Sequence, residues 1–206
     1  MILIIDPCIN PDGRDRYAHF YRMTGNMIPD VDAKTRGHRE PWPGGRTNHY
    51  YHDLNRDWGW QNQKESQERS KLYRQWMPHV HVDYHEQSYN DPYYFAPAVE
   101  PYHELITPWQ KEFQQIIGQN NATSFDHNQL LYFRNEEFDL LYPGFGDTYP
   151  IFNGALGMTY EKGGSGAGGV AVKTSATDTL TLKAVSYTHL RAHETAADLV
   201  CSHLLE

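Results

Sequence analysis

The sequence predicts an α/β layer structure with a mixed, largely parallel sheet. Two segments have the pattern of strands, at 79–85 and 155–162. Two others are rich in helix-forming residues, at 61–76 and at about 102–118. Strands that alternate with helices along a chain are typical of layered α/β domains. At 206 residues the chain is long enough for one sizeable core and not for two.

The chain begins with an apolar run at residues 2–5, which predicts a strand buried on both faces. A chain that starts inside a buried strand is expected to be truncated at its N-terminus. The run leads into Asn-Pro-Asp-Gly at 10–13, a dense turn signal. Residues 14–50 are rich in Arg, Gly, Pro and Asp with weak periodicity, so a long ordered loop is expected there. Loops of that length in compact domains are usually functional or disordered.

The segment 61–76 contains no Gly or Pro, and Pro78 follows as a stop signal for the helix. The next segment alternates strictly, so its side chains divide between two faces of a strand. One face carries Val80, Val82 and Tyr84, and the other carries His79, His81, Asp83 and His85. The segment 102–118 opens near prolines, as helices often do. The apolar strand at 155–162 delivers Glu161 just before a run of glycines.

Composition excludes several classes of function. The formal net charge of −8 argues against nucleic acid as the main partner, because binding phosphates requires a basic face. No apolar run approaches the length needed to span a bilayer. The two cysteines make no disulfide framework and indicate no compartment.

The last segment, 185–206, is expected to be a non-native tail. Residues 185–195 resemble the translation of a transposon adapter used in sequencing libraries. The alternative is an amphipathic C-terminal helix. Because such processing scars carry no fold information, the functional domain is taken as residues 1–184.

Five short motifs occur in order between residues 10 and 164. They are NPDG at 10–13, Arg46 ten residues before Arg56, DLNRDW at 53–58, DYHEQ at 83–87 and MTYEKGG at 158–164. Each is weak alone, but their order makes a specific set. Through them the chain resembles the zinc carboxypeptidases of the carboxypeptidase A type, and especially their cytosolic-carboxypeptidase-like branch.

This resemblance implies a three-layer α/β/α fold with one zinc ion (Zn²⁺). In the family a His-x-x-Glu pair and a later His hold the metal, and His85 matches the later ligand. No His-x-x-Glu occurs anywhere in the chain. The resemblance therefore implies that two further ligands, with an N-terminal strand–helix unit, lie in a missing upstream segment. The isolated chain is then expected to hold zinc poorly, to hydrolyse little, and to be poorly soluble because a sheet edge is unpaired.

The resemblance also assigns roles to the other marked residues. Glu161 would be the general base and acid, and Arg46 would steady the oxyanion at the scissile carbonyl. Asn55 and Arg56 would grip the terminal carboxylate of the substrate, for which the arginine fork is suited. Tyr142, with Tyr149 as second candidate, would close over the substrate, and Asp147 would lie near its side-chain pocket.

The residues themselves leave simpler alternatives open for the three main candidates. His85 is equally placed to be a half-buried histidine at a strand end. Glu161 has Lys162 or an arginine as an alternative structural partner. Arg56 has Asp53 and Asp57 beside it as partners for a surface ion pair.

The function expected from the sequence is zinc-dependent hydrolysis of the C-terminal peptide bond of peptides or proteins. One alternative is a non-catalytic module that binds C-terminal carboxylates. Another is an amidase or deacylase built on the same site. Export from a bacterium, to the periplasm or outside, fits the resemblance, but no residue indicates a compartment, an oligomeric state or a side-chain preference.

Overall fold

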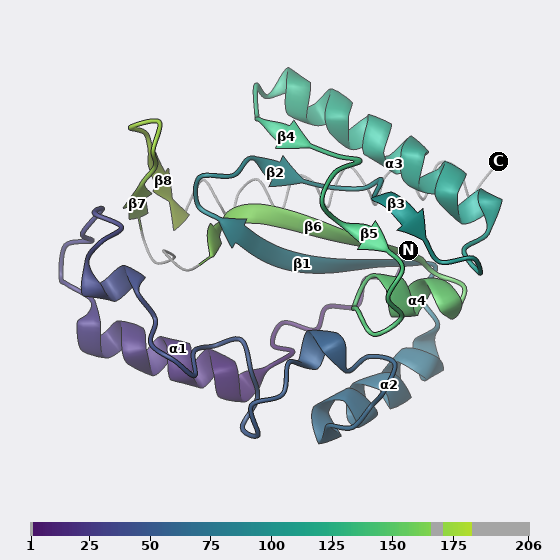
Figure 1. Cartoon of the computed structure of the whole chain (residues 1–206), viewed down its shortest axis with the longest axis horizontal. Coiled ribbons are helices and arrows are strands. Elements are labelled where there is room, and N and C mark those ends of the chain that lie inside the picture. Colours follow the sequence, from purple (N-terminus) through teal and green to yellow (C-terminus); the bar gives the residue numbers. More distant parts are fainter. Residues whose placement is uncertain (1, 166–170, 183–206) are drawn as a thin grey trace.

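The structure is a computed structural model that describes residues 2–165 and 171–182 (Figure 1). Its helices and 3-10 turns are α1 Pro11–Thr24, η1 Arg36–His38, η2 Leu54–Arg56, α2 Lys64–Trp76, α3 Pro108–His127 and α4 Thr148–Phe152. Its strands are β1 Val80–Ser88, β2 Tyr93–Tyr94, β3 Val99–Tyr102, β4 Tyr132–Phe133, β5 Asp139–Leu140, β6 Leu156–Ser165, β7 Ala171–Lys173 and β8 Thr179–Thr181. The tail predicted at 185–206 lies outside the described residues. Within them, no helix is both long and apolar enough to cross a bilayer.

The central sheet has the strand order β1-β6-β2-β4. Its two long strands, β1 and β6, run parallel and pair along most of their length. The short β2 is antiparallel to β6 and parallel to β4. The mixed, largely parallel sheet predicted from the sequence is therefore confirmed, and its two long strands correspond to the strands predicted at 79–85 and 155–162.

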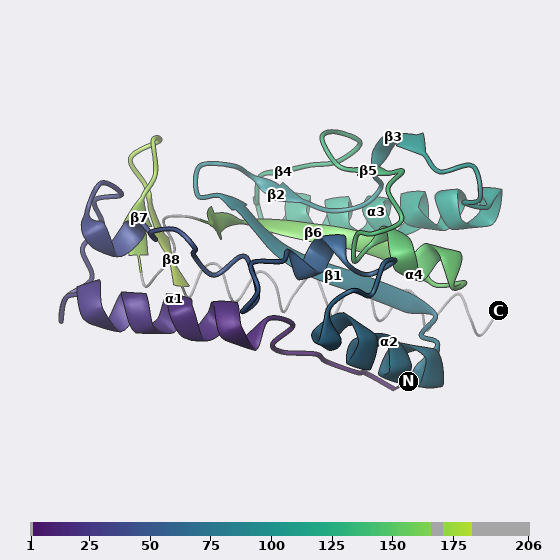
Figure 2. The ribbon, with the colours of Figure 1, turned by 60° about the horizontal axis from the view of Figure 1, so that its bottom comes forward.

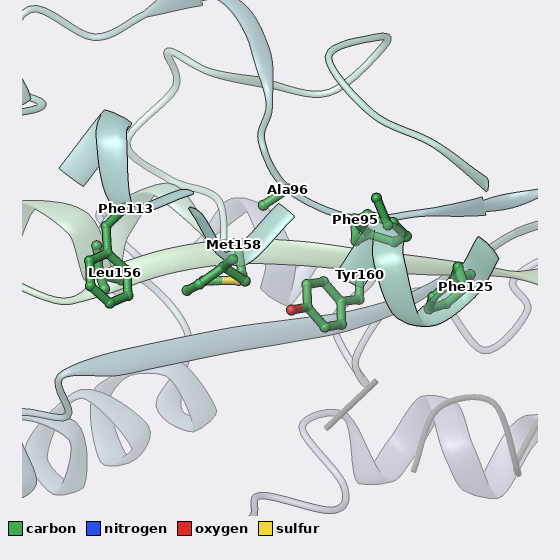
Figure 3. Close-up of a cluster of buried hydrophobic side chains, with 9 residues drawn as sticks. Phe95, Ala96, Phe113, Phe125, Leu156, Met158 and Tyr160 are labelled. Carbon is green, nitrogen blue, oxygen red and sulfur yellow. The ribbon is translucent and has the colours of Figure 1, made fainter. Parts of the chain in front are cut away.

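The main core lies between this sheet and α3. Apolar side chains of β1 and β6 alternate toward the helix, as the sequence pattern predicted, and Ile117 of α3 is completely buried. Figure 3 shows Phe113 and Phe125 of α3 against Leu156, Met158 and Tyr160 of β6. A capping box between Thr107 and Gln110 fixes the start of α3. The helix begins six residues later than predicted and continues beyond Gly118 to His127.

The opposite face of the sheet is covered by α1 and α2, which gives the three layers (Figure 2). Trp58, 3% exposed, packs edge-on against Tyr73 of α2 and against His81 of β1. The polar face of β1 is therefore the face that meets α2 and the loop before it. Any site built from that face lies between the sheet and this second layer.

The strand predicted at residues 2–5 is wrong. The four residues form no strand, and Ile2 and Ile5 are 76% and 68% exposed. An apolar, β-branched run has the propensity for a strand, but a strand also requires a neighbouring backbone to pair with. Within the described residues, β1 stands at the end of the strand order and pairs only with β6.

The long loop predicted at 14–50 is also wrong in its first part, because α1 spans Pro11–Thr24. The turn signal at 10–13 is the start of this helix. The side chain of Asn10 caps the helix by accepting a hydrogen bond from the Gly13 amide, and Pro11 occupies the first turn, where its missing N–H costs nothing. Periodicity was weak because α1 buries only Gly13 and Phe20. Between residues 25 and 50, the 3-10 helix η1 is the only helix or strand.

Gly157 is a point where β6 tolerates no side chain. A Cβ atom built there would lie 1.9 Å from the carbonyl oxygen of Asp147 and 2.9 Å from Ile151 Cγ1. Because a backbone oxygen cannot swing aside, Gly157→Ala is expected to lower the free energy of unfolding by about 1 to 3 kcal/mol. Urea denaturation of both proteins measures the change. The matched control is Gly37→Ala, whose Cβ would meet only Thr24 O at 3.7 Å; equal losses in the two variants would contradict the prediction.

Candidate active site

The parallel pairing of β1 and β6 places His85 directly beside Glu161. The register follows from the core, because Tyr84 and Tyr160 pair toward α3 and meet edge-on there. Side chains alternate along a strand, so the next residue of each strand points to the other face. Two residues far apart in the sequence are thereby brought together on the face covered by the second layer.

Two side chains lie within hydrogen-bond distance of the Nε2 atom of His85, and Nε2 donates to the carboxylate of the two. Asp83 Oδ2 lies 2.7 Å from this atom and Asn55 Nδ2 lies 2.9 Å from it. Burial lowers the pKa of His85, but the hydrogen bond to Asp83 and the charges of Asp83 and Glu161 outweigh it, so that the pKa is raised. With Nε2 engaged by a carboxylate, Nδ1 is the ring nitrogen suited to a metal ion.

Glu161 is 8% exposed, and its Oε2 has no hydrogen-bond partner. Burial raises the pKa of Glu161 to about 7, against the lowering effect of the His85 and Arg46 charges. A carboxyl group with such a pKa can take up and release a proton near neutral pH. The alternative pairing with Lys162 is not what the structure shows, because that ammonium lies 3.3 Å from Glu86 Oε1.

Two arginines share one carboxylate at the edge of the site. Arg46 Nε donates to Asp53 Oδ2 at 2.9 Å, and Arg56 Nη1 lies 4.0 Å from the same oxygen. The Arg56 guanidinium also lies over the ring of Phe145, 4.3 Å from its centre. Both arginine side chains are about half exposed. Since a single carboxylate balances two guanidinium groups, the pair keeps an excess positive charge toward solvent.

Asn55 is turned into the protein. Its Oδ1 accepts a hydrogen bond from the Gly146 amide at 2.8 Å, while its Nδ2 faces His85. A Cβ atom on Gly146 would lie 2.3 Å from Asp83 Oδ2, so only glycine fits there. The sequence predicted that Asn55 and Arg56 act together on a carboxylate; here Arg56 is exposed, whereas Asn55 is partly buried and its amide contacts His85 and Gly146.

The two candidate tyrosines occupy different surroundings. The Tyr142 hydroxyl accepts a hydrogen bond from Trp60 Nε1 at 2.6 Å and lies 3.5 Å from Arg56 O. The Tyr149 hydroxyl accepts from Gln61 Nε2 at 3.2 Å, and its ring packs on Trp58. Tyr142 is therefore the tyrosine beside the arginine pair.

Asp147 supports the end of β6. Its carboxyl oxygens accept hydrogen bonds from the hydroxyls of Thr148 at 3.0 Å and Thr159 at 2.8 Å. Burial raises the pKa of Asp147, against the lowering effect of these hydrogen bonds. The sequence placed this residue near a substrate pocket, whereas its contacts here are with neighbouring protein groups.

One site residue was missed at the level of the sequence. Asp83 is 5% exposed and bonds directly to His85, two residues along the same strand. The alternation at 79–85 already placed both on one face, which was the available signal. A histidine that binds a metal commonly donates its other N–H to such a carboxylate.

The metal-binding capacity of the described residues falls short of a zinc site. Residues 2–165 and 171–182 contain no group of three His, Cys, Asp or Glu side chains arranged to hold a metal ion. A catalytic zinc takes three protein ligands, and only His85 with its Asp83 partner matches one of them.

Comparison with known proteins adds one finding. A solved structure of a metallo-carboxypeptidase from Burkholderia cenocepacia superposes on this chain with a TM-score of 0.56, over 93% of the chain and at 15% sequence identity. The fold is that of a metallo-carboxypeptidase. The chain spans about half of that protein, 52% of its length. No family model matches the sequence, and no curated protein is similar enough to count as a relative. Within the metallo-carboxypeptidase fold, the cytosolic-like branch stays a prediction.

Proposed function

We propose that the chain carries the substrate-binding and general-base part of a zinc-dependent exopeptidase that hydrolyses the C-terminal peptide bond. The observation that supports this most directly is Glu161. It is a buried carboxyl group with a pKa of about 7 and an unpartnered oxygen, and it lies beside His85 in a metallo-carboxypeptidase fold. A buried carboxylate without a structural partner is costly, and such groups are typical of acid–base sites.

The arginine pair gives the site its preference for a chain end. Arg56 is half exposed, and its planar fork matches the two oxygens of a terminal carboxylate. Stacking on Phe145 fixes the plane of that fork without using its outer donors. Arg46, on the other side of Asp53, is then the donor for the carbonyl oxygen of the bond to be cleaved.

We assign proton transfer to Glu161. At neutral pH its carboxyl group exchanges a proton readily, so it can hold the proton of the attacking water and return it to the leaving amine. Zinc, when bound, supplies the Lewis acid of this chemistry, and His85 is the one ligand that the described residues offer to it. Tyr142 is the proposed residue that closes beside the bound carboxylate.

Binding of peptides tests the arginine assignment without any need for turnover. Calorimetric titration with a short peptide is expected to show binding that is lost when the peptide's C-terminus is amidated. Arg56→Lys is expected to weaken binding about tenfold, because a point charge cannot replace a two-point charged hydrogen bond. Arg74→Lys, at an exposed position of α2, is the matched control and is expected to bind as the parent protein does. Equal affinity for free and amidated peptides would overturn the assignment.

A second candidate is a module that binds C-terminal carboxylates without hydrolysing them. Two observations favour it. Both arginines proposed to bind a carboxylate are present, whereas the described residues contain no group of three possible metal ligands and His85 is the one zinc ligand proposed among them. Binding that a chelator leaves unchanged, with no hydrolysis after zinc is supplied, would select this candidate. No observation favours the amidase or deacylase alternative.

A further inference from the structure

The segment 44–48, which carries Arg46, is held through its carbonyl oxygens by two side chains of the α1 region. Asn10 Nδ2 donates to Gly45 O at 3.1 Å and to Arg46 O at 3.2 Å. The three remaining carbonyls of the segment are bound by Arg16, whose Nη1 donates to Gly44 O at 2.8 Å and whose Nη2 donates to Asn48 O at 2.7 Å and to Thr47 O. Every carbonyl of five consecutive residues is thus accounted for.

The start of α1 is shaped for this segment in two further ways. Asp12 Oδ2 accepts a hydrogen bond from the His49 amide at 3.1 Å, just after the held segment. A Cβ atom on Gly13 would lie 2.0 Å from Gly45 O, so the two backbones approach as closely as glycine allows. Together these contacts explain why Asn, Asp and Gly stand in the motif at 10–13, which neither the metal nor the substrate assignment uses.

The held segment needs such support because of its own composition. It follows Trp42-Pro43 and contains Gly44 and Gly45, and glycines lose more conformational freedom on ordering than other residues. It forms no helix or strand, and among the described residues a backbone amide reaches its carbonyl groups only at Asn48 O, from Tyr51 N at 3.1 Å. A guanidinium and an amide NH₂ group supply several donors from fixed positions, which suits a row of carbonyl acceptors.

We propose that Asn10 and Arg16 are positioning residues for Arg46: they fix the backbone on both sides of it, so that its guanidinium stays on Asp53 beside the site. The proposal rests on the proposed function only for what Arg46 then does to a substrate. Asn10 and Arg16 themselves touch no reacting group.

Substitutions at Asn10 separate positioning from helix stability. Its Oδ1 caps α1 by accepting from the Gly13 amide at 3.0 Å, while only its Nδ2 reaches the held segment. Asn10→Ser and Asn10→Asp keep a capping oxygen and remove the two donors. Arg16→Lys keeps the charge and removes the fork. Arg14→Lys is the matched control, since Arg14 is exposed on the same helix and bonds to its neighbour Asp15.

The readout is the Nε–H signal of Arg46 in protein labelled with ¹⁵N-arginine, assigned by its loss in Arg46→Lys. This proton donates to Asp53, so its exchange with solvent reports how firmly Arg46 is placed. Exchange is expected to be about tenfold faster in Asn10→Ser, Asn10→Asp and Arg16→Lys, the factor that corresponds to one or two net hydrogen bonds. Arg14→Lys is expected to exchange at the parent rate. The melting temperature of Asn10→Ser is expected to stay near the parent value, because the helix cap is kept.

The outcomes distinguish this proposal from the proposed function. Unchanged Arg46 exchange in Asn10→Ser and Arg16→Lys would overturn the positioning role, whatever the activity. Faster exchange would support it, and in a zinc-loaded protein that hydrolyses peptides it should come with a lower kcat and an unchanged KM. Faster exchange with hydrolysis unaffected, in these variants and in Arg46→Lys alike, would leave the positioning contacts standing and remove the catalytic role of Arg46.

Discussion

Replacing Glu161 with Gln is expected to stabilise the metal-free protein at pH 8 by about 3 kcal/mol, because its pKa is raised from 4.5 to about 7 in the folded state. A raised carboxyl pKa means that the folded protein binds the proton more tightly than the unfolded chain does. The stability that this proton contributes is present below about pH 4.5 and is lost as the pH rises to about 7. Glutamine imitates the protonated form and avoids the buried charge.

Urea denaturation at pH 5 and pH 8 measures this effect. The parent protein should be less stable at pH 8, and Glu161→Gln should remove most of the difference. The raised pKa values of His85 and Asp147 also lower the stability of the folded protein as the pH rises. The free energy of unfolding of the variant should therefore still fall between pH 5 and pH 8, but by less than that of the parent. Glu104→Gln, at an exposed position before α3, is the control and should keep the parent's pH dependence. A parent protein more stable at pH 8 than at pH 5 would contradict the assignment. Under the proposed general-base role, the same Glu161→Gln change in zinc-loaded protein should lower hydrolysis by about 10² to 10⁴.

Arg46→Ala is expected to lower kcat of the zinc-loaded protein by about 10² to 10³ while leaving KM nearly unchanged. The reason is that, in the proposed role of Arg46, a donor to the developing oxyanion acts mainly in the transition state. Arg56→Ala should have the opposite profile, with KM raised strongly, because the carboxylate that we propose it binds is present from the start. Steady-state kinetics on a peptide and on its shortened analogues separates the two. A rise in KM alone for Arg46→Ala would mean that Arg46 helps to bind the substrate in its ground state and does not stabilise the transition state.

Much of the fold was predictable because two strong patterns decide it. The alternation at 79–85 and the apolar strand before Glu161 define β1 and β6, and these strands pair in the register that brings His85 and Glu161 together. The helix at 61–76 was predictable for a similar reason, since nothing in it interrupts helical propensity. These are local signals that tertiary packing reinforces.

The errors have a different origin. Residues 2–5 have the composition of a strand, but a strand forms only where a neighbouring strand is available for pairing, and the composition of the run does not show whether one is. The motif at 10–13 was interpreted as a turn, yet Asn10 followed by Pro11 is also a helix start, and only the geometry of the Asn10 side chain separates the two. The side chain of Asn55 could not be placed from the sequence, because its partners, His85 and Gly146, are 30 and 91 residues away.

The amide of Asn55 has a consequence for how the site responds to a ligand. One planar group lies between the imidazole of His85 on the sheet and the backbone of the loop that carries Tyr142: its Nδ2 contacts His85 Nε2 at 2.9 Å, and its Oδ1 accepts a hydrogen bond from the Gly146 amide at 2.8 Å. A shift of that loop by an ångström changes one of these two contacts, so the positions of the loop and of the imidazole ring are coupled. If Tyr142 closes over a substrate as proposed, its movement also acts on the histidine, and a ligand at the histidine acts in return on the loop, since such coupling is reciprocal.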